Sequence, residues 1–224
     1  MNKWKDTIFA LATPTGKSAI AVIRISGALA FNIVKQISTN MPKESNVATL
    51  NKIITKKKEY IDQTITTIFK SPKSYTGENM VELSVHGGQA VINKLVETLS
   101  SFRGLRLAEA GEFTRRAFEN NKLDLTQVEA IADLINSETE AQRQQSLKQL
   151  SGLFSNKIQK WSDKIIKILA NIEAIIDFAD EELPKNLLNN TKVQIENISS
   201  RIDNILINSN KGRKIRNGFV VVIM

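Results

Sequence analysis

Short strand-like and helix-like patterns alternate over the first 110 residues of the chain. Runs rich in β-branched residues and bounded by Gly, Pro or polar residues predict strands at 7–12, 19–26, 62–69, 80–88 and 105–109. Apolar residues three or four positions apart predict helices at 28–38 and 89–102. Residues 41–60 are mostly polar, and we expect a loop or hairpin there. The pattern therefore predicts an α/β module.

After about residue 112 the strand pattern disappears and helical spacing takes over. The pairs Thr126 with Glu129, and Ser137 with Glu140, have the spacing of a capping box. In that motif the first side chain bonds to a backbone N–H three residues later and the acidic side chain bonds back. We therefore expect helices to start at Thr126 and at Ser137.

The second part of the chain is expected to be a pair or bundle of antiparallel helices. One continuous helix is predicted from residue 138 to about 180, and Pro184 is expected to end it. A second helix follows, ending between Gly212 and Gly218. It carries an isoleucine seam for packing against another helix, at Ile195, Ile198, Ile202 and Ile205.

Four polar residues are candidates for binding or chemistry. Arg24 interrupts an apolar strand, so it either points to solvent or forms a fork for a carboxylate. Glu82 lies on the polar face of its strand, where a carboxylate can pair with an amino-pyrimidinone edge, or simply meet water. Lys122 either holds an anionic group or has no specific role. His86, the single histidine, is a proton shuttle or a structural residue.

Composition and charge narrow the function classes. No window approaches the roughly 18 uninterrupted apolar residues of a membrane span, and the absence of cysteine excludes disulfides and thiolate metal sites. We expect a cytoplasmic protein without a membrane partner. The net charge is +8, and its excess lies in residues 1–120, with 17 Lys and Arg against 10 Asp and Glu. This balance suits RNA or a polycarboxylate ligand, and equally suits mere solubility.

The chain resembles one known family in four segments that occur in the same order. They are "DTIFALATPTGKSAIAVIRISG" (6–27), "SYTGENMVELSVHGG" (74–88), "GEFTRRAFENNKLDLTQVEAIADLI" (111–135) and "NIEAIIDFADEE" (171–182). The family is the tRNA modification GTPase MnmE, also called TrmE. The third segment is the most diagnostic, because it combines GEFT, RAF and a KLDL-type stretch. The resemblance extends from about Asp6 to the last residue.

The resemblance implies an α+β fold. Residues 1–118 would form a domain similar to the tetrahydrofolate-binding domain of the glycine-cleavage T-protein, and residues 119–217 the first half of a helical domain. Residues 218–224 would be the truncated first strand of the GTPase domain that the family inserts in its helical domain. On this interpretation the chain is a fragment without the GTP site, so GTP, Mg²⁺ and K⁺ would serve only the full-length family protein. Whether the chain is itself an enzyme stays open.

The resemblance also implies a binding site and partners. The family's folate-contacting residues correspond to Arg24 before Ile-Ser-Gly, Glu82 after Tyr-Thr-Gly-Glu, and Lys122 before Leu-Asp-Leu. The ligand would be 5-formyl-tetrahydrofolate or a related one-carbon folate, with Glu82 pairing with the pterin edge. The family acts as a homodimer with the flavoprotein MnmG, and installs an aminomethyl-type group on the wobble uridine of tRNA. No catalytic or metal-ligating residue is implied in this part.

A second hypothesis belongs to a different class. The chain would be a truncated, non-catalytic module that contacts RNA or protein, because its first half is basic and its isoleucine seam lacks partner helices. This hypothesis predicts RNA binding that weakens steeply with salt. The folate hypothesis predicts binding that depends on Arg24, Glu82 and Lys122.

Overall fold

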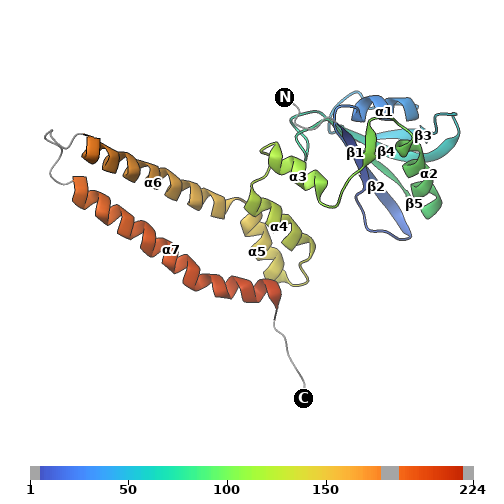
Figure 1. Ribbon diagram of the computed structural model, residues 1–224. Helices are drawn as coiled ribbons and strands as arrows, with labels where there is room; N and C mark the ends of the chain where they lie inside the picture. The colour runs from blue at the N-terminus through green and yellow to red at the C-terminus, as the bar shows by residue number, and fades with distance from the viewer. Residues whose placement is uncertain (1–5, 178–186, 219–224) are drawn as a thin grey trace, which may run out of the picture. The chain divides into compact units, whose positions relative to one another are not determined.

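The computed structural model describes residues 6–177 and 187–218, which fold as two compact units that meet between Leu123 and Asp124 (Figure 1). The first, here called the sheet unit, contains every strand of the described residues, and the second, the helical unit, contains only helices. The fold is therefore α+β, as the resemblance implies. The unit boundary lies a few residues beyond the division at 118 that was expected from the sequence.

The sheet unit is built on a mixed six-stranded sheet with the order β3-β4-β5-β2-β1-β6. Its strands are β1 (Thr7–Leu11), β2 (Ser18–Ser26), β3 (Thr49–Ile54), β4 (Tyr60–Phe69), β5 (Met80–Gly87) and β6 (Leu105–Leu107). Neighbours are antiparallel except β1 and β6, which are parallel. Five strands follow the predicted pattern. β3 lies within the segment predicted as a loop or hairpin and pairs with β4 as the first arm of that hairpin.

One face of the sheet carries the hydrophobic core. The alternation of β2 and β5 turns Ile23, Ile25 and Leu83 to this face, where all three are fully buried. The helices α1 (Ala30–Ile37) and α2 (Gln89–Ser100) pack on the sheet and complete the core. The opposite face therefore receives the polar members of the same strands, among them Arg24, Glu82 and His86.

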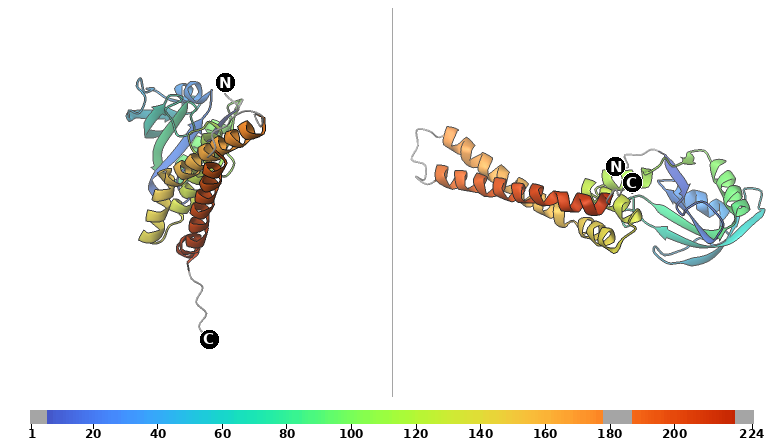
Figure 2. Two further views of the ribbon diagram at one scale, coloured as in Figure 1. Left: turned by 90° about the vertical axis from the view of Figure 1, so that its left-hand side faces the viewer. Right: turned by 90° about the horizontal axis from the view of Figure 1, so that it is seen from below.

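The described residues of the helical unit form two short helices and two long ones. They are α4 (Leu125–Ile135), α5 (Glu140–Leu150), α6 (Leu153–Asp177) and α7 (Leu187–Asn217). The long helices α6 and α7 run side by side in opposite directions (Figures 1 and 2). Ile168 of α6 and Ile198 of α7 are buried, whereas Ile195, another member of the predicted isoleucine seam, is 47 % exposed.

The predicted helix starts are wrong by two residues in each case. The first capping box is formed by Asp124 and Gln127, and the second by Thr139 and Gln142. Thr126 instead donates its hydroxyl to Asp124 Oδ1 at 2.8 Å. Glutamine serves as well as glutamate at the third helical position, so more than one overlapping pair satisfied the same spacing. Local hydrogen bonding selected the pair that the spacing alone did not.

The long helix predicted from residue 138 to about 180 is two helices. α5 ends at Leu150 and α6 begins at Leu153, with Gly152 between them at φ +76°. This left-handed conformation suits glycine and ends a helix. At the other end, Gly218 follows α7 at φ +69°, whereas Gly212 lies inside the helix. Pro184 and the predicted strand beyond Gly218 lie outside the described residues.

Two general features bear on function. In the described residues no helix is both long and apolar enough to cross a membrane. The same residues contain no cluster of His, Asp and Glu suited to a metal ion.

His86, at the end of β5, has an exposed ring whose Nδ1 lies 2.7 Å from Asp62 Oδ1.

Candidate folate-binding site

Arg24 and Glu82 form a pair on the open face of the sheet. They are directly opposite each other in the register of β2 and β5, so both side chains leave the sheet on the same side. Arg24 Nε donates to Glu82 Oε1 at 2.9 Å, and Nη2 lies 2.8 Å from the same oxygen. The side chains are 25 % and 24 % exposed. Glu82 Oε2 makes no hydrogen bond within the described part of the chain, so it remains available as an acceptor.

Two aromatic rings hold the Arg24 guanidinium in place. Its central carbon lies 5.1 Å from the centroid of Tyr75 and 5.6 Å from that of Phe113, within the range of a cation–π contact. The Tyr75 hydroxyl lies 2.9 Å from Thr114 Oγ1. Tyr75 belongs to the loop before β5, and Phe113 to α3 (Glu112–Glu119). The pair is therefore fixed by a loop and a helix that are far apart in the sequence.

Lys122 lies in a neighbouring hollow rather than in contact with the Arg24–Glu82 pair. The hollow has a volume of about 460 Å³ and includes Lys122, Gly77 and Ser71 in its lining. Lys122 Nζ donates to the carbonyl of Pro72 at 3.0 Å and is exposed. An ammonium has three donors, so this bond leaves two for a ligand. The structure brings two of the three candidate residues together and places the third on the other flank of the 70–79 loop.

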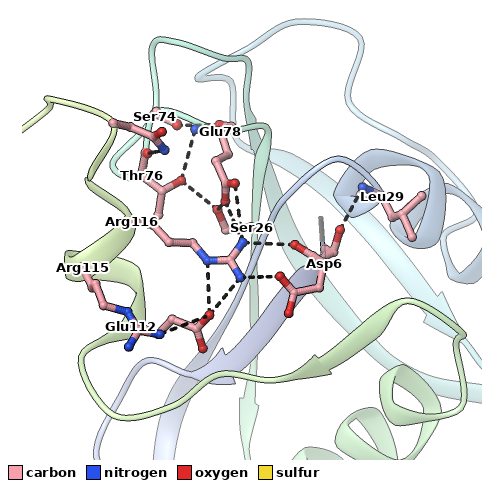
Figure 3. Close-up of polar contacts among 12 residues, drawn as sticks. Asp6, Ser26, Leu29, Ser74, Thr76, Glu78, Glu112, Arg115 and Arg116 are labelled. Carbon is pink, nitrogen blue, oxygen red and sulfur yellow. Dashed lines mark hydrogen bonds and ion pairs between the residues drawn. The ribbon is translucent and has the colours of Figure 1, made fainter. Parts of the chain in front are cut away.

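A buried arginine, Arg116, bonds to the 70–79 loop through Glu78 (Figure 3). The Arg116 side chain is fully buried. Its guanidinium donates to Glu112 Oε1 at 2.9 Å, to Asp6 Oδ1 at 3.0 Å and to Glu78 Oε2 at 3.2 Å. A buried charge is tolerated only when it is paired and hydrogen-bonded, and Arg116 meets both conditions. Its partners come from the start of β1, the loop and α3, so Arg116 joins three parts of the sheet unit.

Glu112 stays ionised within this network. Burial opposes its charge, but hydrogen bonds from Arg106 and Arg116 and from the Glu109 amide outweigh burial and lower its pKa to about 2. Arg106 donates a hydrogen bond to each Glu112 carboxylate oxygen, at 2.7 and 2.8 Å. A bidentate contact of this kind fixes direction as well as charge. Glu112 begins α3, so the contact also fixes where that helix starts.

The network extends to the residues around Lys122. The Ser26 hydroxyl donates to Glu78 Oε2 at 2.8 Å, and the Asn120 side chain donates to the Thr76 carbonyl at 2.7 Å. Gly77 lies between them at φ +78°, and a Cβ there would come within 3.2 Å of Lys122 Cγ. The loop that carries Tyr75 is therefore fixed against the segment that carries Lys122.

Sequence analysis missed this supporting network. The i, i+4 spacing of Glu112 and Arg116 in "GEFTRRAF" is compatible with an ion pair on one helix face. Nothing in the spacing indicates that both side chains are buried, or that Asp6 and Glu78 complete the network. Those partners are 110 and 38 residues away from Arg116.

The site offers complementary groups for an elongated, partly charged molecule. At one flank of the loop, the free Glu82 oxygen accepts hydrogen bonds beside a cation and two aromatic rings. At the other flank, Lys122 offers an exposed ammonium. A ligand with a donor-rich ring at one end and a carboxylate at the other would match both flanks.

Comparison with protein families assigns almost the whole chain. Residues 7–122 match the family described as GTP-binding protein TrmE N-terminus, and residues 125–220 match the MnmE helical domain. The two matches meet where the structure divides into its two units. Sequence families and physical contacts therefore mark the same division.

Individual relatives agree with the family matches. The chain is 44 % identical over 223 residues to the tRNA modification GTPase MnmE of Caulobacter vibrioides, which covers 98 % of this chain and 48 % of that protein. It is 40 % identical over 219 residues to the 5-taurinomethyluridine-[tRNA] synthase subunit GTPB3, mitochondrial, of Danio rerio, covering 97 % and 44 %. The chain thus spans about half the length of the curated relatives it matches.

Proposed function

The chain belongs to the family of tRNA modification GTPases MnmE, and from that premise we propose that its sheet unit binds 5-formyl-tetrahydrofolate for a tRNA-modifying enzyme. The modification is an aminomethyl-type group on the wobble uridine, made together with the flavoprotein MnmG. The cytoplasm is the proposed compartment.

The Arg24–Glu82 pair is the observation that carries this proposal. Its geometry uses one Glu82 oxygen and leaves the other open, so the carboxylate can accept from the amino-pyrimidinone edge of a pterin. Arg24 fixes the direction of the Glu82 carboxylate, and the Tyr75 ring beside Arg24 offers an apolar wall. Lys122 would attract the glutamate carboxylates of the folate. When bound, the folate supplies a one-carbon unit, and the protein supplies position.

A homodimer is part of the same proposal. Beyond the Arg24–Glu82 pair, the open sheet face exposes a patch of apolar residues: Ile20 at 62 %, Leu50 at 59 % and Ile65 at 40 %. The strand registers place these three side chains on the face that carries Arg24 and Glu82. Pairing two such faces would bury the apolar patch and place the folate site beside the second copy.

Isothermal titration of 5-formyl-tetrahydrofolate into the full chain tests the binding proposal. We expect micromolar binding that weakens about tenfold or more in Glu82→Gln, because a neutral amide presents one acceptor and no charge. Glu59→Gln is the matched control, since Glu59 is an exposed carboxylate of the β3–β4 hairpin. If Glu82→Gln bound as tightly as the parent chain, the assignment of Glu82 to the pterin would be wrong.

Light scattering on the same samples tests the dimer. The parent chain is expected at twice its 25.0 kDa mass, and Ile65→Lys at the single mass, because two buried lysines would face each other across the two-fold axis. Lys substitution at Ile166, which is 61 % exposed on α6, controls for a general effect of an added charge. A parent chain that is monomeric at tens of micromolar would contradict the dimer.

A further inference from the structure

A groove between α6 and α7 gathers positive charge in the helical unit. It has a volume of about 490 Å³, and a smaller hollow of about 360 Å³ shares Lys164, Lys167 and Arg201 with it. We call this feature the basic groove, and it is lined by Lys157, Lys160, Trp161, Lys164, Lys167 and Arg201. Of the described residues that line either hollow, Asp163 alone carries a carboxylate.

The spacing of the lysines aligns them along one side of α6. They follow one another at intervals of three, four and three residues, from Lys157 to Lys167, which keeps them on one helical face. At a rise of about 1.5 Å per residue the row is about 15 Å long. Arg201 projects to the same groove from α7, which runs alongside (Figure 2). Two helices thus contribute cations to one elongated track.

This concentration of charge does not follow from composition. Residues 124–224 carry 13 Lys and Arg and 13 Asp and Glu, so the helical unit has no net charge. Five of those cations nevertheless line one groove with a single carboxylate. None of the five forms an ion pair with any residue that the structure describes. A solvated helix face in a neutral unit would instead intersperse both signs.

We propose that the basic groove binds the phosphate backbone of RNA, and that the RNA is the tRNA on which the proposed function acts. A row of lysines on flexible stems suits a repeating polyanion, because each ammonium can meet a phosphate without a fixed angle. Trp161 adds an aromatic surface to the lining of the basic groove, on which an unpaired base can stack. The inference rests on the proposed function only for the identity of the RNA.

The lining favours RNA over an acidic protein segment. Protein partners are usually anchored by apolar and aromatic side chains that enter pockets. Among the described residues that line the basic groove, the apolar ones are Trp161 and Ile205, beside five cations and polar groups. The contact is expected to be electrostatic and largely independent of sequence, with discrimination left to other parts of the modifying complex.

Fluorescence anisotropy of labelled tRNA, titrated with the full chain over a range of salt concentrations, tests the inference. Five phosphate contacts predict a slope of log K against log salt of about −3.5 to −4.5. The double variant Lys160→Gln/Lys164→Gln is expected to bind at least about tenfold more weakly at low salt, with a slope shallower by about 1.5. The matched control is Lys148→Gln/Lys192→Gln, which removes two exposed lysines of the same unit outside the groove.

A local signal shows where the RNA lies. The chain has two tryptophans, and Trp4→Phe leaves Trp161 as the sole reporter. We expect tRNA to quench Trp161 fluorescence in the Trp4→Phe chain. Lys160→Arg/Lys164→Arg, which keeps both charges, should restore the affinity that the glutamine variant loses.

Three outcomes would overturn the inference. They are tRNA affinity that is equal in the groove variant and its control, an unchanged Trp161 signal at saturating tRNA, and displacement by poly-L-glutamate as effective as by unlabelled tRNA. The last would indicate a site for acidic protein. Folate titration on the same samples separates this inference from the proposed function. If the groove variant binds both folate and tRNA as tightly as the parent chain, only the assignment of RNA binding to the basic groove is refuted. If the parent chain does not bind folate, the proposed folate site is refuted.

Discussion

Arg116 in the sheet unit and Lys160 in the helical unit represent opposite uses of positive charge. Arg116 is fully buried and bonds to three acidic residues, so it fixes the geometry of its surroundings. Lys160 is exposed in a row of cations that have no ion-pair partner within the described residues. The first arrangement suits a ligand whose shape must be matched, and the second suits a polymer whose charge must be attracted.

The largest expected effect comes from removing the buried cation. Arg116→Met leaves Glu78 buried without its counter-charge and leaves Glu112 with Arg106 as its remaining close cation, which costs about 3–5 kcal/mol of unfolding free energy. Urea denaturation of the full chain measures this. The adjacent Arg115, 46 % exposed and 3.2 Å from Glu109, is the control, and Arg115→Met should cost at most about 1 kcal/mol. If both variants lost similar amounts of unfolding free energy, Arg116 would not be the residue on which the network depends.

A buried carboxylate of the sheet unit and an exposed one of the helical unit should respond differently to acid and salt. Glu112, with its pKa lowered to about 2, stabilises the fold above pH 4.5, and that contribution is lost as the pH falls from 4.5 towards 2. Glu140 also has its pKa lowered to about 2, by hydrogen bonds from Arg143 and Gln144, but its side chain is 61 % exposed.

High salt should change the pKa of the exposed Glu140 more than that of the buried Glu112. At 1 M salt the Debye length is about 3 Å, so the pKa of Glu140 should rise towards its ordinary value while that of Glu112 stays low. Side-chain carboxyl chemical shifts, followed through an acid titration at low and high salt, measure both groups. Equal responses to salt would mean that Glu112 is not protected by burial.

Glycine substitutions should have opposite signs in the two units. Gly77→Ala places a Cβ at φ +78°, 3.1 Å from Asn120 Cβ, so we expect a loss of about 1–2 kcal/mol together with weaker folate binding. Gly212 lies inside α7, where an added Cβ meets Gln145 Nε2 at an ordinary 3.5 Å. Gly212→Ala should therefore stabilise the helical unit by about 0.5–1 kcal/mol. Thermal unfolding of both variants decides the signs.

A small effect is also expected at the start of α5. Thr139→Ala removes the side chain that accepts from the Gln142 amide, and should cost about 1 kcal/mol. Ser137→Ala, at the position that the sequence pattern favoured, removes only a bond to the Leu134 carbonyl and should cost less. Helicity followed by circular dichroism during urea titration compares the two. If Ser137→Ala lost more unfolding free energy than Thr139→Ala, Ser137 would be the N-cap residue of α5.

Periodicity predicted the elements of the fold better than their ends. The alternation in β5 correctly placed Glu82 on the polar face of its strand, opposite the buried Leu83, because the pleat has a period of two whatever the neighbours are. The break between α5 and α6 at Gly152 was missed, since a glycine in a helical pattern is compatible with either a cap or a continuation. The conformation at Gly152 decides between them.

The site shows the same limit for side chains. Arg24 and Glu82 were both singled out from the sequence, yet their pairing depends on the register between β2 and β5, across 58 residues. The structure pairs Arg24 with Glu82, whereas the role of Arg24 in binding a ligand stays a prediction. The role of Arg116 was invisible, because its partners Asp6 and Glu78 become neighbours only in the folded sheet unit.

The central claim is that the two units use charge for two different ligands, and one paired binding measurement tests it most directly. Affinities for 5-formyl-tetrahydrofolate and for tRNA are measured on Glu82→Gln and on Lys160→Gln/Lys164→Gln. The account predicts that Glu82→Gln loses folate and keeps tRNA, and that the lysine variant loses tRNA and keeps folate. If either variant lost both ligands while remaining folded, or lost neither, the division of roles between the two units would be contradicted.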